Sequence, residues 1–265
     1  MTGAEYEKRP VVVLADDGEP ASDVAWAWLT GHRWEGWDLQ IVTVRWAALA
    51  GGSDVKPSRV VPRRPPQETA LSSWDHVEVT GDPRVVLLGR TDAELMVLGC
   101  HHRGHLAGLW AGSTTEWLLT HPPAPMLIAR HGHPTQSVAL CVDGSPHAHR
   151  ALQAFWTLPW SADVAVSLVS VDDGFTDVER SLKGAGAALP AGIRPARVAR
   201  LRGPARRELV DFVRANQIDL VVMGTRGLTG LTRMRVGSTV SALLKDGSAN
   251  LLIAHVPDPE RAGPG

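Results

Sequence analysis

The feature that most constrains the fold of this chain is an internal repeat. Residues 11–20 match residues 138–146, and aligning Asp17 with Asp143 sets an offset of 126 residues. Three further pairs of segments match at an offset of 125: 94–99 with 219–224, 112–114 with 237–239, and 125–129 with 250–254. Four separated matches at nearly constant spacing indicate a tandem duplication. We therefore expect two domains, 1–134 and 135–265, each near the small end of the usual size range.

Short apolar runs alternate with helix-like segments in each half. The runs predict five strands per half, at 11–15, 39–44, 76–80, 95–98 and 125–129, and at 138–142, 164–171, 197–202, 220–223 and 250–254. Helices are expected at 21–31, 113–120, 146–157, 176–187 and 238–245, and after the Gly-Asp-Pro and Gly-Pro turns that precede 84 and 205. Ser22 or Ser145 is a candidate cap for the first helix of its half.

This alternation predicts the fold class. Strands that are apolar along their length and alternate with helices are typical of a parallel sheet covered on both faces. We expect an α/β protein of two tandem doubly wound domains, each with a five-stranded parallel sheet. Region 46–72 breaks the symmetry, and its glycines and prolines predict a long mobile insertion in place of a helix.

Composition limits the classes of partner. The net charge of −1 comes from 27 basic and 28 acidic residues, divided as 12 and 16 in residues 1–134 and as 15 and 12 in residues 135–265. A near-neutral total does not favour a nucleic-acid binder, whereas the positive second half suits a local anion site. No apolar run reaches eighteen residues, so we expect no membrane span. The mixed N-terminus and only two cysteines, Cys100 and Cys141, lead us to expect a cytoplasmic protein.

The strongest chemical signal is a glycine-rich loop in the second half. Gly224 and Gly227 are followed, after nine intervening residues, by Gly237, Ser238 and Thr239. A glycine lets the backbone N–H approach a phosphate, and a helix that begins at Ser238 would present unpaired N–H groups to it. Arg226 adds positive charge nearby. The alternative is a mobile connection capped by Ser238, because glycine motifs are weak without structural context.

This spacing resembles the ATP-binding motif of the universal stress protein family, in a tandem two-domain form. The start at 142–146, the Gly-Pro turn at 203–204 and the strand at 251–254 also resemble that family, so the similarity covers almost the whole chain. The resemblance implies a Rossmann-like domain of the adenine nucleotide alpha hydrolase type and pairing through the last strands, as a pseudo-dimer within the chain and in a possible homodimer. It also implies a stress-response or regulatory role with ATP, accompanied by Mg as a counter-ion, as the ligand.

The resemblance also assigns roles to individual positions. By position, Asp143 lies near the adenosine moiety, and Ser170, Val171 and Met223 form the adenine side. The phosphate cradle comprises Gly224, Gly227, Gly237, Ser238 and Thr239. For Asp143 the alternative is a residue that only forms the Asp-Gly turn.

The first half departs from this pattern. Asp17, Gly99, Gly112, Ser113 and Thr114 remain, but His102 replaces the second glycine. A side chain then stands where backbone should approach phosphate. We therefore expect the first half to bind nucleotide weakly, not at all, or with a changed geometry.

Two other classes of function stay open. The chain could be a protein-interaction module whose loops are relics, or a nucleotidyl-transferring enzyme that uses the His-x-Gly-His sequence of His102 and His105. That motif follows the first strand in nucleotidyltransferases but the fourth predicted strand here, which favours coincidence. No general base, Walker lysine or pair of metal-binding carboxylates is apparent, so we expect at most slow ATP hydrolysis.

Overall fold

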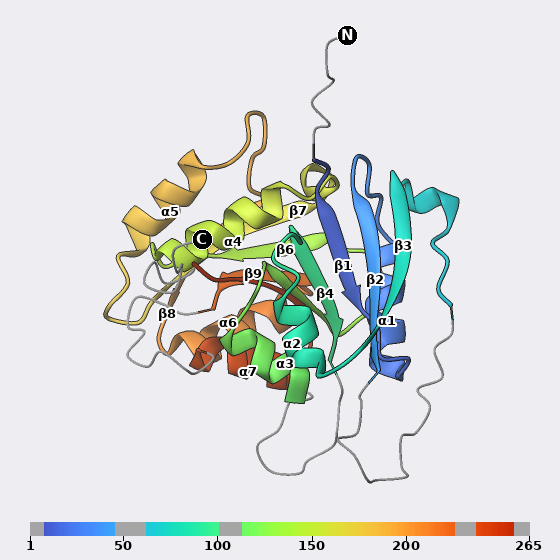
Figure 1. Cartoon of the computed structure of the whole chain (residues 1–265). Helices are drawn as coiled ribbons and strands as arrows, with labels where there is room; N and C mark the ends of the chain where they lie inside the picture. Colours follow the sequence, from blue (N-terminus) through green and yellow to red (C-terminus); the bar gives the residue numbers. More distant parts are fainter. Residues whose placement is uncertain (1–7, 46–61, 101–112, 226–236, 257–265) are drawn as a thin grey trace, which may run out of the picture.

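A single sheet of ten strands runs through the protein (Figure 1). The computed structural model describes residues 8–45, 62–100, 113–225 and 237–256. The strands of the first half are β1 (Val11–Ala15), β2 (Asp38–Arg45), β3 (Ser73–Thr80), β4 (Leu95–Gly99) and β5 (Met126–Ala129). Those of the second are β6 (Ser137–Cys141), β7 (Ala165–Asp172), β8 (Arg197–Arg202), β9 (Leu220–Gly224) and β10 (Asn250–Ala254).

The strand order is β3-β2-β1-β4-β5-β10-β9-β6-β7-β8. From each outer edge inward, both halves therefore have the same order, and all pairs within a half are parallel. The doubly wound α/β fold predicted from the sequence is confirmed. The domain boundaries at 134 and 135 stay a prediction.

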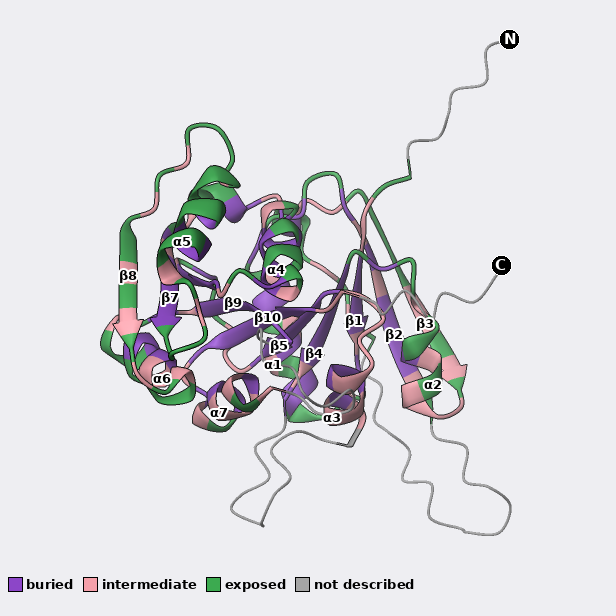
Figure 2. Cartoon of the chain, turned by 90° about the vertical axis from the view of Figure 1, so that its left-hand side faces the viewer, coloured by how far each residue is buried: buried purple, intermediate pink, exposed green. Residues whose placement is uncertain are grey.

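Helices cover both faces of the sheet. They are α1 (Pro20–Thr30), α2 (Pro83–Leu88), α3 (Ser113–Thr120), α4 (Pro146–Trp156), α5 (Val178–Ala187), α6 (Ala205–Ala215) and α7 (Ser238–Asp246), with 3-10 turns at Gln67–Thr69 and Ser161–Asp163. Buried side chains of α1, α4 and α5 pack on one face, and those of α2, α3, α6 and α7 on the other. The central strands are buried, whereas the edge strands β3 and β8 expose alternate polar residues (Figure 2). Among the described residues, no helix is both long and apolar enough to cross a membrane.

The first turn of each half shows why the repeat gives the same local structure. Gly18 and Gly144 follow β1 and β6 with φ of 73° and 79°, a left-handed conformation that glycine adopts without strain. Ser145 then caps α4, because its side chain accepts a hydrogen bond from the N–H of Ala148. The expectation that Ser22 caps α1 is wrong. Glu19 occupies the cap position, and Ser22 lies within the helix.

The two halves join through one antiparallel pair of strands. Leu127 of β5 faces Leu252 of β10, and these two residues are equivalent in the repeat. Asn250 closes one end of this pair. Its buried Oδ1 accepts hydrogen bonds from the N–H groups of Arg130 (2.7 Å) and His131 (2.9 Å), and its Nδ2 donates to the carbonyl of His131.

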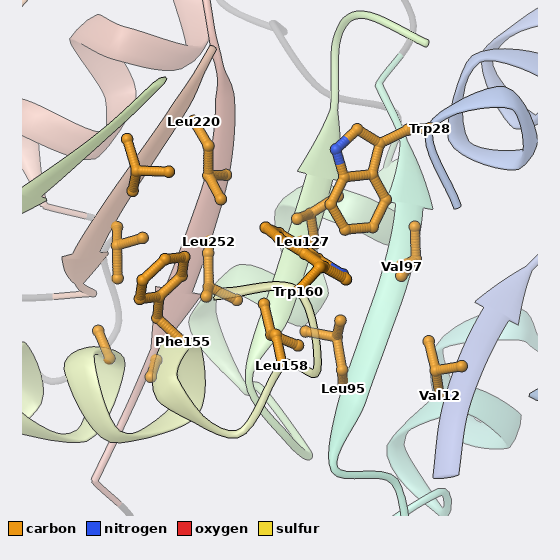
Figure 3. Close-up of a cluster of buried hydrophobic side chains, with 14 of the residues drawn as sticks. Val12, Trp28, Leu95, Val97, Leu127, Phe155, Leu158, Trp160, Leu220 and Leu252 are labelled. Atoms are coloured by element: carbon orange, nitrogen blue, oxygen red, sulfur yellow. The ribbon is translucent and has the colours of Figure 1, made fainter. Parts of the chain in front are cut away.

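Aromatic side chains fill the core beside this joint. Trp160 of the second half lies against Trp28 of the first, with ring centroids 5.8 Å apart, and Leu127 lies close by (Figure 3). Trp34, the repeat equivalent of Trp160, contacts both indoles. The two halves therefore share one aromatic core instead of closing separate ones.

His32 lies inside this shared core. Its Nδ1–H donates to the carbonyl of Trp28 (2.7 Å), and its Nε2 accepts from the N–H of Thr135 (3.0 Å). The ring centroids of His32 and Trp160 are 4.2 Å apart. Burial lowers the pKa of His32 to about 4, the hydrogen bond to Trp28 opposes this shift, and His133 adds to it. The imidazole is therefore neutral in the folded protein, and both ring nitrogens are used.

We expect replacement of Asn250 by Leu to lower the free energy of unfolding by about 3 kcal/mol, because two buried N–H groups lose their acceptor. Urea titration measures this change. Replacing the exposed Gln153 by Ala is the control and should shift stability by less than about 0.5 kcal/mol. Equal effects of the two substitutions would contradict a special role for Asn250 at the joint.

We expect His32 to make the fold less stable in acid. In the unfolded chain His32 has a pKa near 6.5 and is protonated below that pH, whereas in the folded chain it is protonated only below about pH 4. The contribution of neutral His32 to the free energy of unfolding is fully present above pH 6.5, and about 3 kcal/mol of it is lost as the pH drops to 4. The difference in unfolding free energy between the wild type and His32→Gln, measured from pH 7 to pH 4, isolates this contribution. A pH-independent difference would refute it.

Candidate functional site

The carboxyl ends of β9, β6 and β7 form the row of positions where the candidate site lies. The register of these strands, continued by one or two residues beyond the paired positions, places Gly224, Val142 and Ser170 side by side. Neighbouring strands lie about 4.8 Å apart, so the row spans about 10 Å. Their side-chain positions face α4 and α5, since the preceding residues of the same face, Leu140 and Val222, pack there.

The predicted adenine-side residues reach this edge of the sheet but divide between its two faces. Ser170 faces the α4 side, whereas Val171 and Met223 are buried on the side of α6 and α7. Only Ser170 brings a polar side chain. Its Oγ is buried and has no hydrogen-bond partner, and the residue is 2% exposed. A buried hydroxyl without a partner is unusual in a folded protein and calls for an explanation.

Asp143 lies next to this row and is half-buried. Its Oδ1 accepts a hydrogen bond from the N–H of Ser145 (2.9 Å), which fixes the turn into α4. Among the described residues, its other carboxylate oxygen accepts no hydrogen bond. Asp143 therefore fulfils the turn-forming role and still has an acceptor available at the strand ends.

Gly224 is required by packing. A Cβ on this residue would lie 2.7 Å from the Cβ of His147 and 2.8 Å from the backbone N of Ala148 in the first turn of α4. In the first half, a Cβ on Gly99 would likewise overlap the backbone of Ala21. The first glycine of the motif thus brings strand and helix together in both halves.

The two ends of the glycine-rich loop meet at its base. The N–H of Gly237 donates to the carbonyl of Thr225 (3.2 Å), and α7 begins at Ser238, which is exposed, and Thr239, which is half-buried. The helix N-terminus therefore lies beside the end of β9, as an anion site requires. Arg226 and Gly227 lie outside the described residues.

Two histidines that the sequence analysis did not single out for this site lie at the same place. His147 and His255 stack with ring centroids 4.8 Å apart. The N–H of Val256 donates to Nδ1 of His147, and Nδ1 of His255 lies 3.0 Å from the hydroxyl of Thr225. His147 is separated by one residue from the Ser145 cap, but His255 is distant in sequence, so only the register of β9 and β10 brings them together.

The equivalent row in the first half is Gly99, Asp16 and Thr43. Here Asp16 replaces the apolar Val142, and Arg63 covers it. The Arg63 guanidinium lies 2.5 Å from Oδ2 of Asp16 and 2.9 Å from Asp23, with its Cζ 5.5 Å from the ring centre of Trp26. Burial opposes the charge of Arg63, but the hydrogen bonds and charges of Asp16 and Asp23 outweigh it and raise its pKa.

Arg63 also corrects the expectation of a mobile insertion. Residues 62–72 are held against the first half, and residues 46–61 lie outside the described residues. The sequence contained a signal for this contact, because an acidic residue stands at Asp16 where the repeat has Val142 at a buried position.

The other polar groups at the strand ends of the first half are paired as well. The Thr43 hydroxyl lies 2.8 Å from Nε2 of His76 on β3. Asp17, the equivalent of Asp143, accepts a hydrogen bond from the Ser22 hydroxyl. Of the remaining predicted residues, Ser113 begins α3 and Thr114 is half-buried in its first turn, whereas Gly112, His102 and His105 lie outside the described residues.

Metal binding and thiol chemistry find little support in the described part of the chain. No group of three or more potential metal-ligating His, Cys, Asp or Glu side chains occurs there. Both cysteines are buried. Burial raises the pKa of Cys141 to about 12, with a further contribution from Asp143, and raises that of Cys100 against the opposing charge of Arg130.

Comparisons with known proteins agree on one family. The model of the universal stress protein family matches residues 72–130 and 134–255. Universal stress protein MJ0531 of Methanocaldococcus jannaschii is 37% identical over 60 residues, which cover 23% of this chain and only 35% of that relative.

A solved structure of a universal stress protein shares the fold over most of the chain. A universal stress protein from Archaeoglobus fulgidus DSM 4304 superposes with a TM-score of 0.70 at 17% identity, covering 92% of this chain and 97% of its own. Another universal stress protein, solved in complex with cAMP, covers 46% of this chain and 99% of its own at 18% identity, with a TM-score of 0.36. With a family match that extends over both halves, the chain belongs to the universal stress protein family.

Proposed function

We propose that this chain is a cytoplasmic tandem universal stress protein that binds ATP, or another adenine nucleotide, through its second half in a stress-response or regulatory role. The observation that carries this proposal is the difference between two equivalent positions. The Thr43 hydroxyl is paired with His76, whereas the Ser170 hydroxyl is buried without a partner. Within the part of the chain that the structure describes, Ser170 and Asp143 of the second half keep hydrogen-bonding capacity at the strand ends, whereas the equivalent groups of the first half have partners.

The unpaired hydroxyl of Ser170 gives a free-energy reason for ligand binding. A buried hydroxyl without a hydrogen bond costs about 1–3 kcal/mol, which a ligand that supplies the partner would recover. Asp143 offers a second acceptor on the neighbouring strand. In the first half the matching groups, Asp17 and Thr43, already have partners, and Arg63 covers Asp16 between them.

The geometry supports one direction for the ligand. The N-terminus of α7 lies beside the end of β9, which favours phosphates at Gly224, Gly237, Ser238 and Thr239, with Mg²⁺ as counter-ion. Arg226 and Gly227 of the same motif belong to this proposed phosphate site. The adenosine then extends toward Asp143, Ser170, Val171 and Met223. The surplus of positive charge in residues 135–265 favours an anionic ligand on this side.

The repeat supplies a matched pair of variants. Replacing Asp143 by Ala should lower ATP affinity at least tenfold, because the adenosine loses an acceptor, whereas Asp17→Ala should leave it unchanged. Isothermal titration gives affinity and stoichiometry, with about one nucleotide expected per chain. Thermal unfolding verifies that both variants fold. If Asp17→Ala lost ATP affinity and Asp143→Ala kept it, the site would lie in the first half, which would contradict the proposal.

Ser170→Ala should have two opposite effects. Without nucleotide, the variant should be as stable as the wild type or more stable by about 1 kcal/mol, because an unpaired buried hydroxyl is removed. The stabilisation that saturating ATP provides should become smaller. Thermal unfolding with and without ATP measures both effects. A variant that is less stable without nucleotide and gains the full stabilisation from ATP would contradict the role of Ser170.

A further inference from the structure

An exposed aromatic side chain stands at the same edge of the sheet. Phe175 lies in the turn between β7 and α5 and is 73% exposed, the largest fraction among the described large apolar side chains. It follows Ser170 by five residues and the end of β7, Asp172, by three. A phenylalanine in this position leaves a large apolar surface in water, next to the strand ends where the proposed ligand lies.

The turn that carries Phe175 is closely held by hydrogen bonds. Oδ1 of Asp173 accepts from the N–H groups of Phe175 and Thr176, both at 3.1 Å. Oδ1 of Asp172 accepts from the N–H of Gly174, whose φ of 87° lies in the left-handed region. Asp177 then caps α5 by accepting from the N–H of Arg180. These hydrogen bonds therefore fix the backbone position from which the Phe175 side chain projects.

Three features lie at or just beyond the ends of the neighbouring strands β6 and β7: the exposed ring of Phe175, the unpaired hydroxyl of Ser170 and the available oxygen of Asp143. Flat aromatic rings stack on nucleobases, and stacking is tolerant of base identity because every base has a π-face. A hydroxyl and a carboxylate supply the directional hydrogen bonds that stacking lacks. Together they match a ligand with one flat heteroaromatic face and polar groups at its rim.

We propose that Phe175 stacks on the base of the bound nucleotide and so closes the adenine end of the site. This inference rests on the proposed function, since it names a recognition residue for the same ligand. Phe175 then contributes affinity for any nucleobase, and Ser170 and Asp143 contribute the choice among bases. The phosphates at the α7 end are recognised independently of Phe175.

The test compares ligands that contain the base with one that lacks it. ATP, adenosine and inorganic tripolyphosphate are titrated against the full chain, Phe175→Ala and Phe175→Trp. The control variant is Val198→Ala, which truncates another exposed apolar side chain, on edge strand β8. Phe175→Ala should weaken ATP and adenosine about tenfold, and should leave tripolyphosphate unchanged. Phe175→Trp and Val198→Ala should keep the affinity of the wild type for ATP.

The possible failures are distinguishable. ATP binding that is equal in the wild type and Phe175→Ala would overturn the stacking role and leave the proposed function intact. Equal weakening of ATP and tripolyphosphate would also overturn it, because the effect would not depend on the base. A wild type that binds no nucleotide would overturn the proposed function and this inference together. A change of oligomeric state in Phe175→Ala, measured by sedimentation, would assign Phe175 to an interface between copies of the chain.

Discussion

The antiparallel pairing of β5 with β10 is the contact on which the rest of the structure depends. Only three residue pairs make it, yet it turns two five-stranded sheets into one of ten strands. Asn250 satisfies the backbone groups just beyond the pairing, and Trp28 and Trp160 fill the core beside it. Because a short ladder alone is weak, the buried amide and the shared aromatic core determine how the halves sit against each other.

The two halves share one fold but differ in the residues at the carboxyl ends of their strands. At the centre of the row, one half has Val142 and the other has Asp16, and this difference decides what covers the strands. A buried carboxylate requires a cationic partner, which Arg63 supplies from the insertion. A buried valine requires only packing, so the neighbouring Ser170 and Asp143 keep their hydrogen-bonding capacity. Duplication thus preserved the fold, while the polar groups named at the strand ends of the first half found partners within the chain.

Much of this arrangement could be predicted from the sequence. The sequence pattern predicts all ten strands to within about three residues. Eight of them are largely apolar because both of their faces are covered, whereas the edge strands β3 and β8 are more polar. The contact of His147 with His255 could not be predicted, since it joins residues distant in sequence that only the folded sheet brings together. An acidic residue at the buried position Asp16 indicated that a cation would cover it, but the sequence did not identify Arg63 as that cation. Ser22 does not cap α1, because the helix begins at Pro20 and the Ser22 hydroxyl donates to Asp17.

Asn250 also makes the joint between the two halves asymmetric. Its repeat equivalent is Pro125, which has neither an amide side chain nor a backbone N–H. A symmetric dimer of two first halves would lose the hydrogen bonds that the asparagine makes. A dimer of two second halves would bring two copies of Asn250 to the joint without the Pro125 that accompanies it in this chain. The hydrogen bonds of this joint therefore run between a side chain of the second half and backbone groups of the first, so two repeats of the same fold meet through unlike contacts.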